Sequence, residues 1–382
     1  MVSLTDLPID YRKTIARYVT FLRYLGIDFF NDLKPTEKVL RLFVFSLFFI
    51  PFALNQFTLI SEINADDFLE GARVVPLAVM FLLDKFNYIF MEILDLWPKD
   101  KLNQEKADIL KTWTRKMSLL LYSFYVYAMV NLVLFEIFPA ITTVLSSRNG
   151  DVVYILPFKF GNRWQVNSTF SYVVTYLWEL ACTMPCQAWL YVPYDLLTVT
   201  ITSNVSVLFR LLQVDLENCI KNDRAVEGNG KTISNNLYNK MTKLVKVHER
   251  LLSLSKKLSE VFGLVIFVHV AVSAIIICFF GYLTVVFGGV ADTIANLLSV
   301  LNSVVIIFFL ALAGELLSDT STKVADAAYN CLWYDCDGRV KKLILIIIIR
   351  SQRPSYLSAL GYSNMTLRAF SKVSRINNIS NK

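Results

Sequence analysis

The chain alternates between long apolar runs and shorter polar segments, and this alternation predicts its secondary structure. A helix needs about 20 apolar residues to cross the hydrocarbon core of a bilayer. Six runs of roughly that length or more predict transmembrane helices at residues 39–60, 72–90, 117–146, 169 to beyond 200, 259–282 and 292–312. The pattern is typical of an all-α, polytopic helical membrane protein with six clear spans within residues 39–314.

Segments outside these runs predict helices that do not cross the membrane. Residues 1–38 place apolar and basic side chains on opposite faces, as in a helix lying on a membrane surface. The fourth span is expected to continue as helix to about residue 212, into an extension at 210–258. One face of the amphipathic helix in this extension holds Met241, Leu244, Val245, His248, Leu251, Leu252, Ser255 and Leu258.

The segment 315–365 holds an apolar block that is too short to cross a bilayer. This block, residues 340–349, carries Lys341-Lys342 near its start and is followed by Arg350, and aromatic residues precede it. It predicts a buried core helix in a packing segment at the end of the membrane domain.

Composition and charge agree with a membrane protein and place its loops. The chain is 55% hydrophobic and 18% charged, whereas soluble domains carry about 25% charged residues. The net charge of +7 does not indicate nucleic-acid binding, because the basic residues lie between apolar runs. Lys and Arg alternate between rich and poor loops, which predicts a multi-pass plasma-membrane protein with a cytoplasmic N-terminus.

The same topology separates three possible glycosylation sites. Asn167 begins an Asn-Ser-Thr acceptor in a loop predicted to lie outside the cell, so it is the expected glycan site. Asn204 and Asn364 also fit the acceptor pattern, but both are predicted to lie at or inside the cytoplasmic face.

Few residues offer catalytic or metal chemistry. The chain has only two histidines and no glycine-rich phosphate loop, so we expect no enzyme activity, no cofactor and no metal site. Cys331 and Cys336 have metal-like spacing, but two small buried thiols are the favoured interpretation. Structural pairing is likewise favoured over function for the ionisable residues at membrane depth, which are Asp84, Lys85, Glu136, Glu179, Asp195, His269 and Glu315.

Residues 314–366 carry a set of motifs that resembles the C-terminal signature of the insect odorant receptor family. A Gly-Glu pair ends the last clear span, aromatic motifs follow, and an Arg-Ser-Gln-x-Pro motif comes after the apolar block. The matching residues are Gly314, Glu315, Ser321, Val324, Ala325, Ala328, Tyr329, Trp333, Tyr334, Arg350, Ser351, Gln352, Pro354, Leu357 and Ala359.

The resemblance implies an inverted seven-helix fold and a function. The seventh helix is split into a short cytoplasmic helix and a pore-type final helix at 366–382. It also implies an odorant-binding tuning subunit of a ligand-gated cation channel, located in sensory-neuron dendrites. Such a subunit forms a heterotetramer with a co-receptor, and Tyr329, Trp333 and Tyr334 would belong to the anchor between subunits.

The outer halves of the predicted spans combine aromatic, aliphatic and hydroxyl side chains. A cavity with this lining suits a small volatile of low polarity, although helix packing or lipid contact gives the same pattern. The candidate ligand-binding residues are Val75, Ala78, Phe81, Phe135, Phe138, Ile141, Thr142, Tyr172, Thr175, Tyr176, Glu179, Tyr282, Leu297 and Leu301.

The pore-type segment departs from the family pattern. It includes Lys372 and Arg375, and it keeps a narrow apolar face with Val373 and Ile376 as its pore candidates. Basic residues at the bilayer centre each cost about 2.5 to 3.5 kcal/mol. A truncated or replaced ending, and with it a non-conducting variant, is the favoured interpretation. The alternative is a working pore helix that packs its apolar face on the helix bundle and turns its polar face to a water-filled pore.

Two other classes of function are weighed against the channel. A G-protein-coupled chemoreceptor is disfavoured, because no Asp-Arg-Tyr follows the third span and no Asn-Pro-x-x-Tyr closes the last one. A small-molecule transporter is disfavoured by the absence of an internal repeat.

Overall fold

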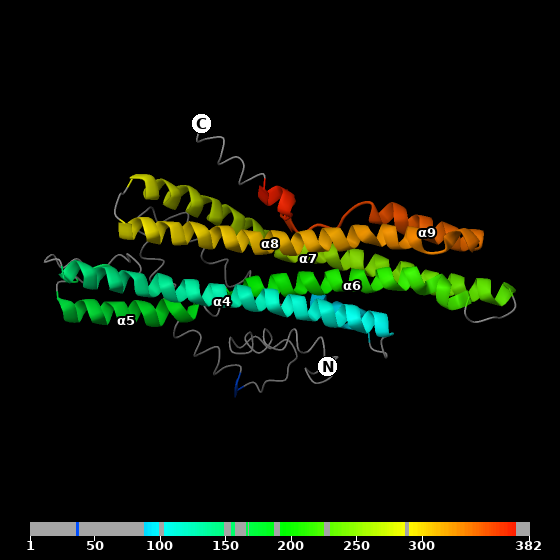
Figure 1. The fold of residues 1–382 in the computed structure, drawn as a ribbon, viewed down its shortest axis with the longest axis horizontal. Coiled ribbons are helices and arrows are strands. Elements are labelled where there is room, and N and C mark those ends of the chain that lie inside the picture. The colour runs from blue at the N-terminus through cyan, green and yellow to red at the C-terminus, as the bar shows by residue number, and fades with distance from the viewer. Residues whose placement is uncertain are drawn as a thin grey trace. The chain divides into compact units, whose positions relative to one another are not determined.

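The computed structural model describes residues 36–37, 88–98, 103–148, 154–156, 166, 168–186, 192–224, 230–286 and 290–371. These residues form an almost entirely helical structure (Figure 1), in agreement with the predicted fold class. The predicted helix at 1–38, the first span, most of the second span and the ending at 372–382 lie outside the described residues.

The labelled helices are long, and several continue well beyond the predicted spans. Their bounds are α4 (Gln104–Arg148), α5 (Thr169–Cys186), α6 (Val192–Arg224), α7 (Gly230–Val286), α8 (Val290–Asn330), the 3-10 helix η3 (Trp333–Asp335) and α9 (Gly338–Ser351). Two-residue strands, β1 (Ser358–Ala359) and β2 (Ser363–Asn364), pair antiparallel after α9.

The continuity of α4, α7 and α8 differs from the predicted division into spans and loops. The 45-residue α4 begins inside the segment predicted as a basic loop. In the 57-residue α7, the predicted amphipathic helix and the fifth span form one helix. Similarly, the 41-residue α8 runs from the sixth span through Gly314 to Asn330. No proline interrupts α7 or α8, so nothing in their backbones forces a break.

Two helices are described within the predicted fourth span. The 18-residue α5 ends at Cys186, and α6 begins at Val192. Pro193 lies in the first turn of α6, where a residue without a backbone N–H is tolerated. Pro185 lies in the last turn of α5, where it cannot donate the i→i−4 hydrogen bond.

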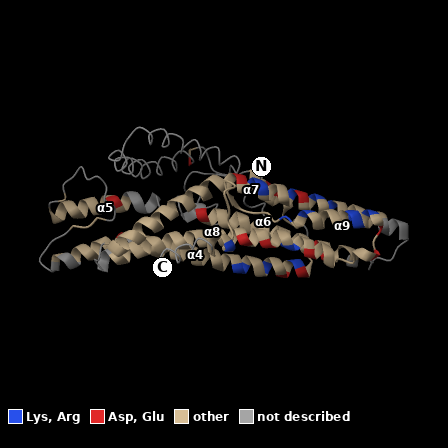
Figure 2. Cartoon of the chain, turned by 90° about the horizontal axis from the view of Figure 1, so that it is seen from above, with Lys and Arg blue, Asp and Glu red and all other residues tan. Residues whose placement is uncertain are grey.

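Four described helices are long and apolar enough to cross a membrane. They are Gln104–Val144, Asp195–Ile220, Asn235–Val286 and Thr293–Asn330. In α7, residues 261–286 contain no Asp, Glu, Lys or Arg, whereas charged residues are frequent before them (Figure 2). This stretch is about 39 Å long at 1.5 Å per residue, which exceeds a hydrocarbon core of about 30 Å.

The chain divides into two compact units, each with its own set of segments. Unit 1 contains residues 1–84, 118–197 and 273–305, and unit 2 contains residues 85–117, 198–272 and 306–382. In unit 2, α6 is the central helix, because 94% of its apolar window is buried. Phe209 and Leu216 of α6 and Met241, Leu251 and Leu258 of α7 are fully buried in this core. The last three confirm the predicted amphipathic face.

Polar contacts tie other parts of unit 2 to this core. The Gln213 side chain of α6 donates a hydrogen bond of 2.7 Å from Nε2 to the Thr320 carbonyl of α8. His248 of α7 lies 3.3 Å from the Ser351 hydroxyl at the end of α9. Arg250 forms ion pairs with Glu92, at 2.7 Å, and with Asp95, at 2.8 Å.

α9 is amphipathic rather than buried on all sides. Val340, Ile344 and Ile347 are buried, as the prediction required. Leu345, Ile346 and Ile349 are more than half exposed within this single chain. The prediction of a buried core helix is therefore correct for one face and wrong for the other, because an uninterrupted apolar block conceals which face has a neighbour.

Candidate functional site

A cluster of tyrosines joins α4 and α5 in unit 1, where Figure 1 shows α5 running beside the second half of α4. We call Tyr154, Tyr172 and Tyr176 the tyrosine cluster. The rings of Tyr154 and Tyr172 stack with centroids 5.1 Å apart. Tyr176 follows one helical turn after Tyr172, and their centroids are 5.7 Å apart. Aromatic residues of two segments thus form one packed group.

Hydroxyl and backbone groups hold this cluster together. The Ile155 N–H donates a bond of 2.9 Å to the Thr143 hydroxyl of α4. The Tyr172 hydroxyl lies 3.0 Å from the Ile155 carbonyl and 3.2 Å from the Thr143 hydroxyl, and it can donate its proton to either. Tyr172 and Thr143 therefore clamp both backbone groups of Ile155.

Two further contacts extend the network. The Tyr154 hydroxyl lies 3.0 Å from the Thr169 hydroxyl at the start of α5. The Tyr176 hydroxyl donates to the carbonyl of Glu136, in the middle of α4. The side chains of Glu136 and Glu179 are each only 1% exposed, so two carboxyl groups lie inside this mostly apolar unit.

The structure gives the predicted ligand-binding residues different environments. Tyr172 and Tyr176 come together in the cluster, and Glu179 is buried on the same helix. The Thr142 hydroxyl donates to the Pro139 carbonyl at 2.8 Å, and the Thr175 hydroxyl donates to the Ser171 carbonyl at 2.8 Å. Both threonine protons are thus used within their own helices and are not available to orient a ligand.

The remaining candidates divide into exposed, partly buried and undescribed residues. Phe138 is half-buried, whereas Ile141, Tyr282, Leu297 and Leu301 are each at least half exposed, as for lipid-facing side chains. Residues that fall outside the described part of the chain are Val75, Ala78, Phe81, the side chain of Phe135, the pore candidates Val373 and Ile376, and Asn167.

Sequence reasoning missed Thr143, Tyr154 and Ile155 as members of the network. Thr143 directly follows the candidate Thr142, but it faces α5 and residue 155 instead of its own helix. Tyr154 and Ile155 lie between the third and fourth predicted spans, where no periodic pattern was identified, so nothing in the sequence placed them. The Tyr172–Tyr176 spacing of one helical turn was the usable signal.

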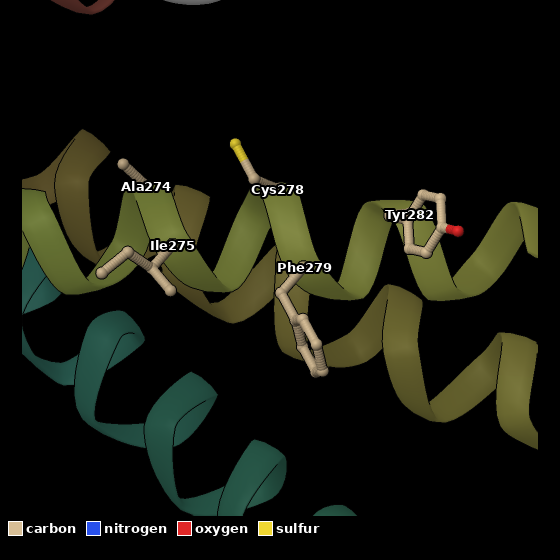
Figure 3. Close-up of a pocket in the computed structure, with 5 residues that line it drawn as sticks. All are labelled: Ala274, Ile275, Cys278, Phe279 and Tyr282. Atoms are coloured by element: carbon tan, nitrogen blue, oxygen red, sulfur yellow. The ribbon is translucent and has the colours of Figure 1, made fainter. Parts of the chain in front are cut away.

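A separate hollow of about 530 Å³ lies along one side of α7 (Figure 3). It is lined by Ala274, Ile275, Cys278, Phe279 and Tyr282, all from this one helix. Ile275 is 67% exposed and Tyr282 is 64% exposed. Ligand pockets bury about 70 to 90% of their ligand, which a lining of exposed side chains from one helix does not achieve. We therefore take the tyrosine cluster, and not this hollow, as the candidate site.

The predicted anchor aromatics lie at the end of α8 and in η3. The rings of Tyr329 and Trp333 are 6.3 Å apart, and those of Trp333 and Tyr334 are 6.2 Å apart. Tyr329 is 64% and Tyr334 58% exposed in this chain, and Trp333 is half-buried. The three residues form a contiguous aromatic surface on unit 2.

Cys331 lies beside this aromatic surface and is buried as predicted, whereas Cys336 is only half-buried. Its thiol is 2% exposed and donates to the Ala328 carbonyl at 3.0 Å. Burial, reinforced by the nearby Cys336 and Cys219, raises the pKa of the Cys331 thiol to about 11. Among the described residues, no group of three or more His, Cys, Asp or Glu side chains is arranged to hold a metal ion.

Comparisons with known proteins extend over most of the chain. The family model described as 7tm Odorant receptor matches residues 77–376. Odorant receptor 67a of Drosophila melanogaster is 23% identical, over 89% of this chain and 88% of its own length. Odorant receptor 85b of the same organism is 34% identical, over 32% of each chain.

Solved structures show the same fold. The insect olfactory receptor OR5 of Machilis hrabei superposes with a TM-score of 0.74 and 13% identity, over 96% of this chain and 97% of that one. The structure of the same receptor in complex with eugenol gives a TM-score of 0.69 and 14% identity, over the same shares of the two chains.

Proposed function

The chain belongs to the insect odorant receptor family, and from that premise we propose that it is the odorant-binding tuning subunit of a ligand-gated cation channel. The match to the family over residues 77–376 carries this proposal, because it covers the helices that hold the tyrosine cluster and the anchor aromatics. Because this family consists of receptors, its match also favours a receptor function over an enzymatic one.

The proposed ligand is a small volatile molecule of low polarity that binds beside the tyrosine cluster. Aromatic faces supply apolar contact area, and a Tyr hydroxyl can still accept a hydrogen bond while it donates its own proton. The buried carboxyl groups of Glu136 and Glu179 lie in the same unit. A relative with this fold has been solved with eugenol, a small aromatic molecule, which supports this class of ligand.

The proposed partner is a co-receptor subunit in a heterotetramer in the plasma membrane. The exposed face of α9, with Leu345, Ile346 and Ile349, supports this assignment, as do the exposed rings of Tyr329 and Tyr334. Apolar side chains outside the membrane-spanning stretches have no lipid to cover them, so a protein partner is the favourable cover. Here we place the anchor between subunits.

Current recording tests the proposal. Cells that express this chain with an insect odorant co-receptor are exposed to an odorant panel, and cells with the co-receptor alone serve as control. The expected result is a current that needs both chains and whose odorant selectivity follows this one. Current without any co-receptor, or a second-messenger response without current, would favour the transporter or the G-protein-coupled alternative. Surface-expressed tetramers without current would favour the non-conducting variant.

A further inference from the structure

Residues 355–366 lie between α9 and the final described helix, which begins at Leu367, and we call them the connecting segment. Their own secondary structure is limited to the two-residue pairing of β1 with β2. Further bonds within the segment run from the Met365 N–H to the Leu357 carbonyl, at 2.8 Å, from the Tyr362 N–H to the Ala359 carbonyl, at 3.0 Å, and from the Gly361 N–H to the Ser358 hydroxyl, at 2.8 Å. The turn at its tip also has positive φ values, 51° at Leu360 and 80° at Gly361. These bonds shape the segment itself, but they do not fix its position against the neighbouring helices.

Side chains of α7 and α8 satisfy the backbone of the connecting segment. The Ser355 N–H donates to the Ser321 hydroxyl of α8 at 3.0 Å. The Ser358 N–H donates to the Ser259 hydroxyl of α7 at 2.9 Å. Each helix thus offers one serine to a backbone amide that has no strand partner, and the segment is tied to both helices.

Two glycines let the backbone of the segment approach these helices closely. A Cβ atom on Gly314 of α8 would lie 2.0 Å from the Met365 carbonyl oxygen, a distance that no structure tolerates without movement. A Cβ atom on Gly263 of α7 would lie 3.1 Å from the Ser358 carbonyl oxygen, which is tight. Glycine is therefore sterically required at position 314, whereas at position 263 it is only preferred.

Glu315, directly after Gly314, meets the start of the final helix. Its Oε2 atom accepts the Leu367 N–H at 3.1 Å, and the Thr366 hydroxyl accepts the Ala369 N–H at 3.2 Å. A carboxylate at a helix N-terminus satisfies an open backbone donor and complements the positive end of the helix dipole. On the following turn, the ring of Phe370 packs edge-on against that of Phe308 of α8, with centroids 5.8 Å apart.

We propose that these groups form a positioning site, the seat, made of Ser259, Gly263, Gly314, Glu315 and Ser321. The seat holds the connecting segment in one register against α7 and α8, and it sets where the final helix begins. A movement of either helix then reaches the final helix through the seat. The proposal rests on the proposed function only where it treats the final helix as part of the conduction path.

A cross-linking experiment tests the geometry independently of channel activity. Phe308→Cys and Phe370→Cys are introduced together into the full chain, co-expressed with the co-receptor, and joined with a short thiol-specific cross-linker in membranes. Gly314→Ala is expected to lower the cross-linking yield at least fivefold, because the Met365 carbonyl must move away. The matched control is Gly281→Ala, since a Cβ atom there meets nothing within 4 Å. Gly263→Ala should fall between the two.

Hydrogen exchange tests the Glu315 contact. Glu315→Ala should speed exchange of the amides at 366–370 about fivefold, the size expected for loss of one helix cap. Glu315→Gln should restore most of the protection, because an amide oxygen still accepts the Leu367 N–H. Asp319→Ala, one turn further along α8, removes only an exposed carboxylate paired with Lys323 and should change nothing.

The outcomes separate the seat from the channel proposal. If Gly314→Ala cross-links as well as Gly281→Ala, or if Glu315→Ala exchanges like Asp319→Ala, the seat is refuted even when odorant currents are normal. If cross-linking and exchange behave as expected but the chain gives no current, the seat is supported and the channel role is rejected. Where both hold, Glu315→Ala should lower odorant-evoked current while surface expression and co-receptor assembly stay as in Asp319→Ala.

Discussion

Removing the Tyr172 hydroxyl tests whether the tyrosine cluster organises the binding region. Tyr172→Phe keeps the ring and its contacts with Tyr154 and Tyr176 but removes the bond to the Ile155 carbonyl. A hydrogen bond of this kind contributes about 1 kcal/mol, which corresponds to about a fivefold change in an equilibrium. Tyr172 is 7% exposed, so water cannot readily replace the lost donor.

Odorant dose–response curves measure the consequence. If ligands bind the arrangement in which Ile155 is clamped, Tyr172→Phe should raise the half-maximal concentration by up to about fivefold for all active odorants. Tyr122→Phe on α4 is the matched control, because that ring is 57% exposed and the change removes the same atom. Surface expression and co-receptor assembly should be the same for both variants.

A double-mutant cycle makes the reasoning refutable. Thr143→Val removes the other side of the Ile155 clamp, where the hydroxyl accepts the Ile155 N–H at 2.9 Å. Because both side chains hold one residue, the two substitutions should be non-additive, with the double variant little worse than the worse single one. Strict additivity, or a Tyr172→Phe curve that overlays that of Tyr122→Phe, would show that the cluster only packs α4 against α5.

Three further predictions concern other parts of the chain. Asn167→Gln should remove a glycan seen as a gel-mobility shift, whereas Asn204→Gln should not, since Asn204 is 4% exposed inside α6; the opposite result would reverse the predicted topology. Trp333→Ala should reduce co-purification with the co-receptor without changing odorant preference, because its neighbours form an exposed aromatic surface; altered tuning with normal assembly would contradict the anchor. In native membranes, Cys331 should resist a water-soluble maleimide up to about pH 9 and react faster only as the pH approaches the pKa of its thiol, about 11. Denaturation should expose it at once. Rapid labelling of the native chain near neutral pH would contradict its burial.

The apolar pattern of the sequence predicted the class of fold and much of the helical content. The face of α7 that includes Met241, Leu251 and Leu258 was predicted from its 3.6-residue period, and the structure buries it. The family resemblance came from motifs at 314–366, and the comparisons confirm it. These successes depend on periodicity and on local motifs, both of which a single chain displays.

Features that depend on distant neighbours could not be predicted from the sequence. One predicted span holds two described helices, α5 and α6, with Pro185 near the end of the first and Pro193 near the start of the second. Residues 343–349 are all apolar, so nothing in their order indicates which face of α9 is buried. Thr143 joins the cluster through residues 12 and 29 positions away in sequence. Periodicity carries no information about such pairs.

The seat also depends on distant neighbours. The sequence contains the Gly314-Glu315 motif, but it does not show which contacts require these two residues. Gly314 and Glu315 were recognised as a family signature at the end of a span. Only the structure shows that the Met365 carbonyl requires the glycine and that the Leu367 N–H requires the acceptor. Contacts with Met365 and Leu367, about fifty positions later in the sequence, thus explain the Gly314-Glu315 pair.

Buried hydroxyls of α6 give a last prediction, on stability. Ser203 is 2% exposed, and in the described part of the chain its Oγ atom has no hydrogen-bond partner. Ser206 is fully buried on the same helix, but its hydroxyl donates to the Thr202 carbonyl at 2.9 Å. Burying a hydroxyl without a partner costs about 1 to 3 kcal/mol, whereas a bonded hydroxyl recovers that cost.

Alanine substitutions at these two serines should therefore have opposite effects. Ser203→Ala removes an uncompensated polar group and should raise the temperature at which the detergent-solubilised protein loses its monodisperse chromatographic peak. Ser206→Ala loses a made bond and should lower that temperature or leave it unchanged. Both changes delete one oxygen from the same buried helix, so side-chain volume and helix propensity are matched. A lower transition temperature for Ser203→Ala than for Ser206→Ala would refute this reasoning. It would mean that the Ser203 hydroxyl forms a hydrogen bond in the membrane, either to a water molecule beside α6 or to a second subunit.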